Sequence, residues 1–180
     1  MQPKPAPGKR RPRLAIQIEP VWNQITPELT AELRAFWREN NAIGDPQMAN
    51  ERAQQAICVA RAATGKICGV STAVLCVLPR LLQPMYYYRT FLAKTARGQG
   101  LVTAMHNQSH EILQTYNQAL ATPESLGVLV ELESPFLSAL YKHAYTPETN
   151  TIFIGYSPRG FQLRVCYFKG AILLPPTKGT

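Results

Sequence analysis

Residues 90–105 read TFLAKTARGQGLVTAM and place an arginine and two glycines between an apolar run and a stretch that is typical of a helix. The first N–H groups of a helix lack partners, and the aligned peptide dipoles make that end positive. Gly98 and Gly100 would let an anion approach the backbone closely, while Arg97 could add a charge and Thr103 a hydroxyl. Two interpretations stay open on these residues alone: a phosphate-binding loop, or a strand-to-helix turn that needs glycine only for its geometry.

Two acidic residues further along the chain could act as a base. Glu131 and Glu133 alternate with apolar residues in GVLVELE (127–133), so their side chains point to the same face of a predicted strand. A carboxylate within reach of an amine can take its proton, directly or through a water molecule. The sequence equally allows a strand face that is only solvated, and both interpretations stay open.

Two histidines lie four residues apart on a predicted helix. His106 and His110, with Glu111 beside them, have a spacing that can bind zinc, but no third ligand follows at a suitable distance and the His-Glu-x-x-His order is absent. We therefore predict an exposed polar helix face and no metal site. The sequence also lacks a Gly-x-Ser-x-Gly elbow and a lysine-containing phosphate loop, so hydrolase and nucleoside triphosphatase chemistry have no local support.

Local patterns predict the elements that must position these residues. Three pairs have the residue types of a helix start, a capping side chain followed by proline: Thr26-Pro27, Asp45-Pro46 and Ser134-Pro135. The predicted helices span 26–40, part of 45–55, 101–120 and 134–145. The predicted strands span 14–22, 56–62, 67–78, 85–93, 127–133, 151–157 and 161–168, with 79–84 as a loop. This order predicts an α/β (α+β) domain, with a mixed and mainly antiparallel central sheet flanked by helices.

The composition suits one packed domain. The chain has 180 residues, 46% of them hydrophobic and 17% charged, which argues against wholesale disorder. The formal net charge is +8, but five of the cations fall in residues 1–13, which contain no acid. We predict a disordered basic tail over 1–13, a single domain over 14–170 and a C-terminal tail over 171–180.

The cysteines bear on the compartment. Cys58, Cys68, Cys76 and Cys166 lie in largely apolar runs and form no Cys-x-x-Cys pair, so we predict buried free thiols, which fit a reducing compartment. No apolar segment is long enough to span a membrane, and the N-terminus lacks the apolar stretch of a secretory signal. We expect a cytoplasmic protein with no membrane partner.

The loop that follows the strand at 85–93 resembles the acyl-CoA loop of the GNAT-type N-acyltransferases. That family carries Gln/Arg-x-x-Gly-x-Gly/Ala after a strand and at the start of a helix. Arg97 and Gly100 match this pattern, whereas Val102 departs from the usual Gly or Ala. The departure leaves the backbone N–H groups in place, and the resemblance implies that these groups hold the pyrophosphate.

A second resemblance lies in SPFLSALYKHAY (134–145). After its fifth strand the family often has an Asn, then a Tyr seven residues on, then Gly-Phe after three more residues. Ser134 stands where the Asn would be, Tyr141 keeps the seven-residue spacing, and Ala144-Tyr145 replaces Gly-Phe one residue early. With both motifs on the expected elements, residues 14–170 resemble a distant member of this family.

The resemblance implies transfer of an acyl group from acyl-CoA, acetyl-CoA by default, to a primary amine by direct attack. Tyr141 would protonate the departing sulfur, and this role is favoured over the alternative, in which its ring belongs to the core with the hydroxyl at the rim. The strand at 85–93 has no carboxylate where family members often carry their base, so Glu131 or Glu133 could take the proton instead. The cofactor-binding residues implied are Phe91, Leu92 and Ala93 for the pantetheine arm, Arg97, Gly98, Gln99, Gly100, Leu101, Val102 and Thr103 for the pyrophosphate, and Ser134.

The leading hypothesis is an N-acetyltransferase that acts on a small-molecule or peptide amine. The alternative is a non-catalytic CoA- or partner-binding module on the same fold, because Val102, Ser134 and the missing strand carboxylate depart from the family pattern. Nucleic-acid binding through residues 1–13 is a further alternative, less favoured than a solvated tail because this segment has no aromatic residues. The sequence is compatible with a homodimer and does not define the assembly.

Overall fold

The computed structural model describes residues 15–175, so the predicted basic tail at 1–13 and the last five residues of the predicted C-terminal tail lie outside the described residues. The strands are β1 (Ile16–Pro20), β2 (Ala56–Ala62), β3 (Ile67–Leu78), β4 (Gln83–Leu92), β5 (Gly127–Leu132), β6 (Tyr145–Thr146), β7 (Thr151–Tyr156) and β8 (Gln162–Tyr167). The helices are α1 (Pro27–Glu39), α2 (Pro46–Ala53), α3 (Leu101–Ala119) and α4 (Pro135–Leu140), with a 3-10 turn, η1, at Lys94–Ala96.

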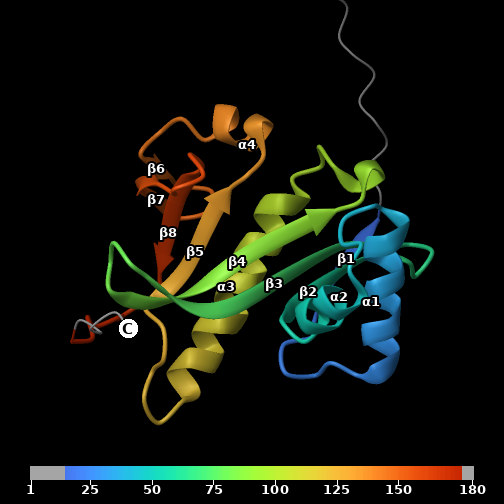
Figure 1. Cartoon of the computed structure of the whole chain (residues 1–180), viewed down its shortest axis with the longest axis horizontal. Helices are drawn as coiled ribbons and strands as arrows, with labels where there is room; N and C mark the ends of the chain where they lie inside the picture. Colours follow the sequence, from blue (N-terminus) through green and yellow to red (C-terminus); the bar gives the residue numbers. More distant parts are fainter. Residues whose placement is uncertain (1–14, 176–180) are drawn as a thin grey trace, which may run out of the picture.

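The strands form one eight-stranded sheet in the order β1-β2-β3-β4-β5-β8-β7-β6. Each neighbouring pair is antiparallel except β4 and β5, which run parallel because α3 carries the chain back between them. Figure 1 shows α1 and α2 in front of the sheet and α3 crossing behind it. The predicted fold class, a mixed and mainly antiparallel sheet flanked by helices, is confirmed.

The helices begin where the sequence predicts. Oγ1 of Thr26 and the carboxylate of Asp45 accept backbone N–H bonds at 3.2 and 2.8 Å at the starts of α1 and α2, and a proline follows each cap. Proline is suited to this position because its missing N–H would have no partner inside the helix. Oγ of Ser134 caps α4 in the same way at 3.4 Å. The start of α3 differs, since Gly100 is its N-cap and no side chain bonds to its first N–H groups.

The two faces of the sheet are covered by different helices. Leu33, Phe36 and Trp37 of α1 are buried in a cluster with α2 on one face. Met105 and Leu113 of α3 are buried on the other face. Each helix therefore contributes an apolar stripe to a core that lies on its own side of the sheet.

Alternation along β4 distributes its side chains between these two faces. Tyr86 and Tyr88 belong to the core cluster under α3, whereas Phe91 packs in the cluster with α1 and α2. Tyr87 and Arg89 share the parity of Phe91 and therefore face the side of α1 and α2. The three consecutive tyrosines thus separate into core positions and one position that is free to line a site.

The predicted loop at 79–84 is too long. Strand β4 starts at Gln83, because its first residues continue the antiparallel register with β3, in which Gln83 lies opposite Leu78. The proline at position 84 is tolerated inside this strand, two residues before β5 becomes the neighbour of β4 on its other side.

The predicted helix at 134–145 is also too long. Helix α4 ends at Leu140, because the carbonyls of His143 and Ala144 accept bonds from Nη2 of Arg164 at 2.8 and 3.3 Å. These bonds hold the bend at His143 and Ala144 that leads into β6, a short strand that the sequence does not predict.

Strands β4 and β5 pair over a short stretch only. Their register runs from Tyr86 opposite Val128 to Tyr88 opposite Val130, and β4 then continues to Leu92 without β5 as a neighbour. Figure 1 shows the two strands diverging beyond this stretch. The parallel pair therefore creates an opening in the middle of an otherwise continuous sheet.

All four cysteines are free thiols. Cys58, Cys68 and Cys166 are buried and Cys76 is half-buried, which confirms the prediction of unpaired cysteines in apolar surroundings. Among residues 15–175, none of the helices combines the length and the apolar character that crossing a bilayer requires.

Candidate active site

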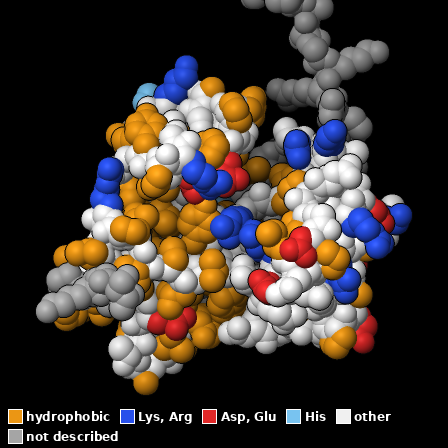
Figure 2. Space-filling view, viewed as in Figure 1, with side chains coloured by type: hydrophobic (Ala, Val, Ile, Leu, Met, Phe, Trp, Pro, Cys, Tyr) orange, Lys and Arg blue, Asp and Glu red, His pale blue; other side chains and the backbone are white. Residues whose placement is uncertain are grey.

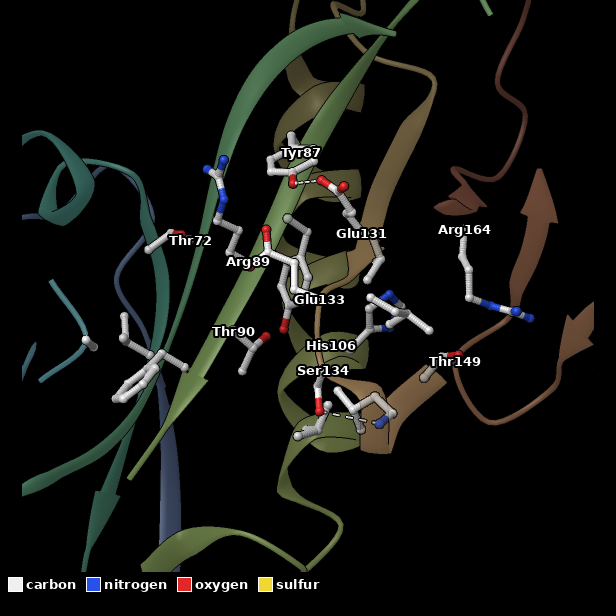
Figure 3. Close-up of a pocket in the computed structure, with 18 of the residues that line it drawn as sticks. Thr72, Tyr87, Arg89, Thr90, His106, Glu131, Glu133, Ser134, Thr149 and Arg164 are labelled. Atoms are coloured by element: carbon white, nitrogen blue, oxygen red, sulfur yellow. Dashed lines mark hydrogen bonds between the residues drawn. The ribbon is translucent and has the colours of Figure 1, made fainter. Parts of the chain in front are cut away.

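A cavity of about 370 Å³ lies where β4 and β5 diverge. Its walls come from β4, β5, the first turns of α3, α4 and the side of α1 and α2 (Figure 3). The predicted site residues that line it are Phe91, Val102, Glu131, Glu133, Ser134 and Tyr141. The predicted site residues outside its lining are Leu92, Ala93, Arg97, Gly98, Gln99, Gly100, Leu101 and Thr103. Figure 2 shows basic and acidic side chains side by side near the middle of this face.

The loop that precedes α3 exposes its backbone. Gly98 and Gly100 have φ angles of +79° and +74°, in the left-handed region that glycine adopts without strain. A Cβ placed on either glycine would meet no atom within 4 Å, so both face open space. The buried side chain of Leu101 anchors the first turn. The first N–H groups of α3, which no side chain caps, are therefore available to an anion.

Arg97 lies against the end of β4. Its Nε donates to the carbonyl of Leu92 at 3.2 Å, while the N–H of Ala93 donates to the carbonyl of Cys68 in β3 at 2.9 Å. Peptide groups of successive residues in a strand point in opposite directions. Leu92 therefore turns its peptide groups toward the divergence, whereas Phe91 and Ala93 turn theirs toward β3. Of the three residues that the resemblance assigns to a pantetheine arm, Leu92 is therefore the one whose backbone is best directed to bond with it.

Helix α4 presents the two residues of the second motif. Oγ of Ser134 is engaged in capping the helix, and its side chain also lines the cavity. Tyr141 follows the last helical residue, is half-buried, and lines the cavity close enough to Arg164 for an electrostatic interaction. The structure thus brings Tyr141 to the cavity, although Tyr141 lies just beyond the helix and not within it.

Glu131 and Glu133 share one guanidinium group. Nη2 of Arg159 lies 2.7 Å from a carboxylate oxygen of Glu131 and 2.5 Å from one of Glu133. Glu131 also accepts the hydroxyl of Tyr87, as the dashed line in Figure 3 marks. The Glu131 side chain is 7% exposed and that of Glu133 is 52% exposed. The two carboxylates therefore face the same way, but in different surroundings, and no sequence motif indicates Arg159 as their partner.

The surroundings of Glu131 keep it ionised. Burial works to raise its pKa, but interactions with Ser157, Tyr87 and Arg159 outweigh burial and hold the pKa below its ordinary value. Burial and the neighbouring Glu131 in turn raise the pKa of Tyr87 to about 12. At neutral pH Glu131 is therefore a fixed negative charge and a weak proton acceptor, and Tyr87 stays protonated as its donor.

The prediction of an exposed polar face at His106 and His110 is wrong for His106. This side chain is 5% exposed, lies edge-on to Tyr88 with ring centroids 5.4 Å apart, and lines the cavity. The spacing of His106 in the sequence could have predicted its burial, because His106 follows Val102 by one helical turn and precedes the buried Leu113 by two. Within residues 15–175, no three His, Cys, Asp or Glu side chains are grouped in a way that could hold a metal ion.

His106 offers a hydrogen-bond acceptor to the cavity. Its Nδ1 lies 3.3 Å from Oδ1 of Asn107, and Nδ2 of Asn107 donates to the carbonyl of Glu148 at 2.9 Å. An amide oxygen can only accept, so Nδ1 of His106 carries the proton and Nε2 is the acceptor. Nε2 is buried and has no hydrogen-bond partner among the described residues. Because buried polar atoms are rarely left without partners, Nε2 is suited to a donor group of a bound ligand.

Burial of His106 makes stability depend on pH. Burial lowers its pKa from 6.5 to about 4, so between these values the unfolded chain binds more protons than the folded one. We expect the free energy of unfolding to fall as pH decreases from 6.5 to 4, with His106 contributing about 3 kcal/mol. Urea denaturation of the protein and of His106→Phe at pH 7 and pH 4.5 measures this contribution. An equal loss of stability in both proteins would contradict it.

Arg164 forms a buried cationic wall of the cavity. It is 2% exposed, and Nη2 donates to the His143 carbonyl at 2.8 Å and to Oγ1 of Thr146 at 2.9 Å. No carboxylate lies within ion-pair distance of Arg164 in the part of the chain that is described. Burial lowers its pKa. The bonds of Arg164 hold the segment after α4 and thereby fix where Tyr141 lies.

Comparison with known proteins identifies the fold through structure. No protein-family model matches the sequence, and no curated protein matches it. A GNAT-family acetyltransferase from Streptococcus pneumoniae is similar in structure, with a TM-score of 0.57 at 16% identity over 85% of this chain and 99% of that chain. The ribosomal-protein-S5-alanine acetyltransferase from Vibrio fischeri gives 0.60 at 9% identity, over 88% of this chain and 96% of its own.

A third structure, described as AtaTR bound with AcCoA, gives a TM-score of 0.52 at 13% identity, over 83% of this chain and 93% of that chain. These alignments span nearly the whole of the neighbouring chains. The chain therefore has the fold of the GNAT acetyltransferases.

Proposed function

We propose that the protein is an acyl-CoA-dependent N-acetyltransferase that moves an acetyl group from acetyl-CoA to a primary amine by direct attack. The observation that carries this proposal is the uncapped start of α3, where Gly98 and Gly100 face open space beside a cavity between diverging strands. A helix start of this kind stabilises a pyrophosphate group. The fold that the chain shares with a GNAT-family acetyltransferase, and with a further structure solved with AcCoA bound, supports the same function.

The residues present fit acyl-CoA along a path from the loop to the cavity. Backbone N–H groups of residues 98–103 can bind the pyrophosphate, and Arg97 adds positive charge beside them. Leu92 offers strand-like hydrogen bonds to an extended arm, and His106 offers an acceptor deeper in the cavity. Val102 lines the cavity with its side chain but leaves its own N–H at the start of the helix.

Acetyl-CoA supplies the acetyl group as a thioester. The departing sulfur needs a proton, and Tyr141, which lines the cavity directly after α4, would donate it. Arg164 beside Tyr141 adds a buried positive charge, which stabilises the negative charge that develops during transfer. The role of Tyr141 is that of a general acid, and the role of Arg164 is to position and polarise it.

Glu131 and Glu133 would handle the amine in different ways. Glu131, held ionised against Tyr87 and Arg159, attracts the ammonium form of the acceptor into the cavity. Glu133 has a half-exposed side chain, so a proton that it takes from the amine can pass to solvent. We therefore assign Glu133 as the base and Glu131 as the charge that positions the amine.

Calorimetry with acetyl-CoA and with CoA tests the proposal first, and release of free CoA thiol in the presence of a broad panel of amines tests it second. We expect micromolar binding of acetyl-CoA and amine-dependent thiol release. Folded protein that binds neither acetyl-CoA nor CoA would overturn the proposal.

A non-catalytic CoA-binding module is the second candidate. The ion pairs of both acidic side chains with Arg159 favour it, because one oxygen of each carboxylate is already bonded to the guanidinium group and not to an amine. The same experiment separates the two functions. Binding of acetyl-CoA without transfer to any amine of the panel indicates the binding module, whereas transfer to any of them excludes it.

A further inference from the structure

Two arginines line the cavity on the face of α1 and α2. Arg52 comes from the last turn of α2, and Arg89 comes from β4 just beyond its pairing with β5. Both are partly buried. Figure 3 shows Arg89 on the same side of β4 as Tyr87, reaching back along the strand toward it. These two guanidinium groups therefore belong to the same compartment as the Tyr87–Glu131 pair.

Neither arginine forms a close ion pair with a described carboxylate. In the described part of the chain, no carboxylate lies within 4.0 Å of the guanidinium nitrogens of Arg52 or Arg89. The contrast with Arg61 is clear, since Arg61 is bonded to both Glu19 and Glu32. The two carboxylates of the cavity are already bonded to Arg159. Glu133 acts on Arg52 only at longer range, so among the described residues the cationic wall made by Arg52 and Arg89 has no ion pair of its own.

This wall is electrostatically unfavourable without a ligand. Burial, followed by the positive charge of Arg89, lowers the pKa of Arg52 and outweighs the opposing effects of Tyr87 and Glu133. Arg89 is held over the ring of Tyr87, with its Cζ 4.2 Å from the ring centroid, which orients its guanidinium without neutralising it. Partly buried charges are normally paired, and arginine is suited to forked recognition of carboxylate and phosphate oxygens. An anion bound at this wall would supply the missing partner.

We propose that the acceptor amine carries an anionic group, a carboxylate or a phosphate, which Arg52 and Arg89 bind while the amine lies toward Glu131 and Glu133. The proposal rests on the proposed acetyltransferase function and names its substrate class. The cavity, at about 370 Å³, must also take the reactive end of the donor, so it favours a small molecule over a large one. A small amine with an acidic group satisfies both charged walls at once.

The experiment compares matched acceptors that differ only in the anionic group. The carboxylate arm pairs amino acids and β-alanine with their amides, and the phosphate arm pairs O-phosphoethanolamine with ethanolamine. Turnover of each pair is measured with the protein, with Arg52→Met, with Arg89→Met and with Arg38→Met. Arg38 is an exposed arginine of α1 outside the cavity lining and serves as the matched control. Acetyl-CoA affinity is measured for every variant by calorimetry.

We expect the anionic member of at least one pair to be the better substrate, and each cavity variant to lower its kcat/KM by about 10- to 100-fold, the effect of losing a charge-assisted hydrogen bond. The amide or ethanolamine member should change less than about threefold in the same variants. Arg38→Met should leave both members unchanged. The arm that responds identifies carboxylate or phosphate as the recognised group.

Equal turnover of charged and neutral members, or an equal effect of the variants on both, would overturn the inference and leave the acetyltransferase proposal standing. If acetyl-CoA does not bind, the acetyltransferase proposal fails instead, and the anion site is then judged by calorimetry with the same anionic amines alone. Binding that is lost in Arg52→Met and Arg89→Met and retained in Arg38→Met would support the site. Absence of binding would overturn it.

Discussion

Gly100→Glu should weaken acetyl-CoA binding by at least about 100-fold, because it places bulk and negative charge where the pyrophosphate is expected. The Cβ of the new side chain would meet no atom of the protein within 4 Å, so the site is lost without a clash in the fold. A positive φ of +74° strains a glutamate backbone, at a cost of about 1–2 kcal/mol in stability. Calorimetry with acetyl-CoA measures the affinity, and circular dichroism verifies the fold.

Two controls separate charge from backbone strain in this experiment. Gly65→Glu places the same residue at another open glycine with a φ of +80°, in the turn between β2 and β3, and should bind acetyl-CoA normally. In Gly100→Asn the new residue tolerates the left-handed region and adds no charge, so this variant should retain most of its affinity for acetyl-CoA. Near-normal binding by Gly100→Glu would show that the start of α3 does not hold the pyrophosphate.

Tyr141→Phe is expected to lower kcat by about 100-fold and to change the affinity for acetyl-CoA by less than about threefold, because a general acid acts mainly in the transition state. The phenylalanine ring keeps the packing of Tyr141 at the end of α4 and removes only the hydroxyl. Steady-state kinetics with thiol detection gives kcat, and calorimetry gives the affinity for the donor.

The matched control is Tyr156→Phe, which removes the hydroxyl of an exposed tyrosine in β7 that does not line the cavity. It should retain the activity of the unmodified protein. A loss of acetyl-CoA affinity in Tyr141→Phe with unchanged kcat would assign Tyr141 to binding. Full activity in Tyr141→Phe would contradict the role of Tyr141 as general acid and would indicate that the departing sulfur takes its proton from solvent.

The parts of the fold that sequence predicts well are those set by local chemistry. The starts of α1, α2 and α4 follow from Thr26, Asp45 and Ser134, since a cap and the proline after it act within one turn of helix. The alternation of Glu131 and Glu133 also predicts that both face the same way, although Glu133 lies one residue beyond the end of β5. Such signals need no knowledge of the rest of the chain.

The parts that sequence misses depend on distant partners. The end of α4 is set by Arg164, which lies more than one element away, and the burial of His106 depends on Tyr88 in β4. The wall made by Arg52 and Arg89 joins two residues of no recognisable motif, which α2 and β4 bring to one cavity. Contacts of this kind join residues that are distant in sequence, so they can be identified only from the folded structure.

The short pairing of β4 with β5 has a mechanical consequence. In the described part of the chain, the strands β1–β4 are joined to the strands β5–β8 within the sheet by three register pairs and by the bond from the N–H of Leu126 to the carbonyl of Pro84. Helix α3 is packed mainly against the first set. A ligand arm that bonds to both strands beyond Tyr88 would act as an additional cross-link between the two halves. Ligand binding should then slow amide hydrogen exchange across the whole sheet, including strands that never touch the ligand.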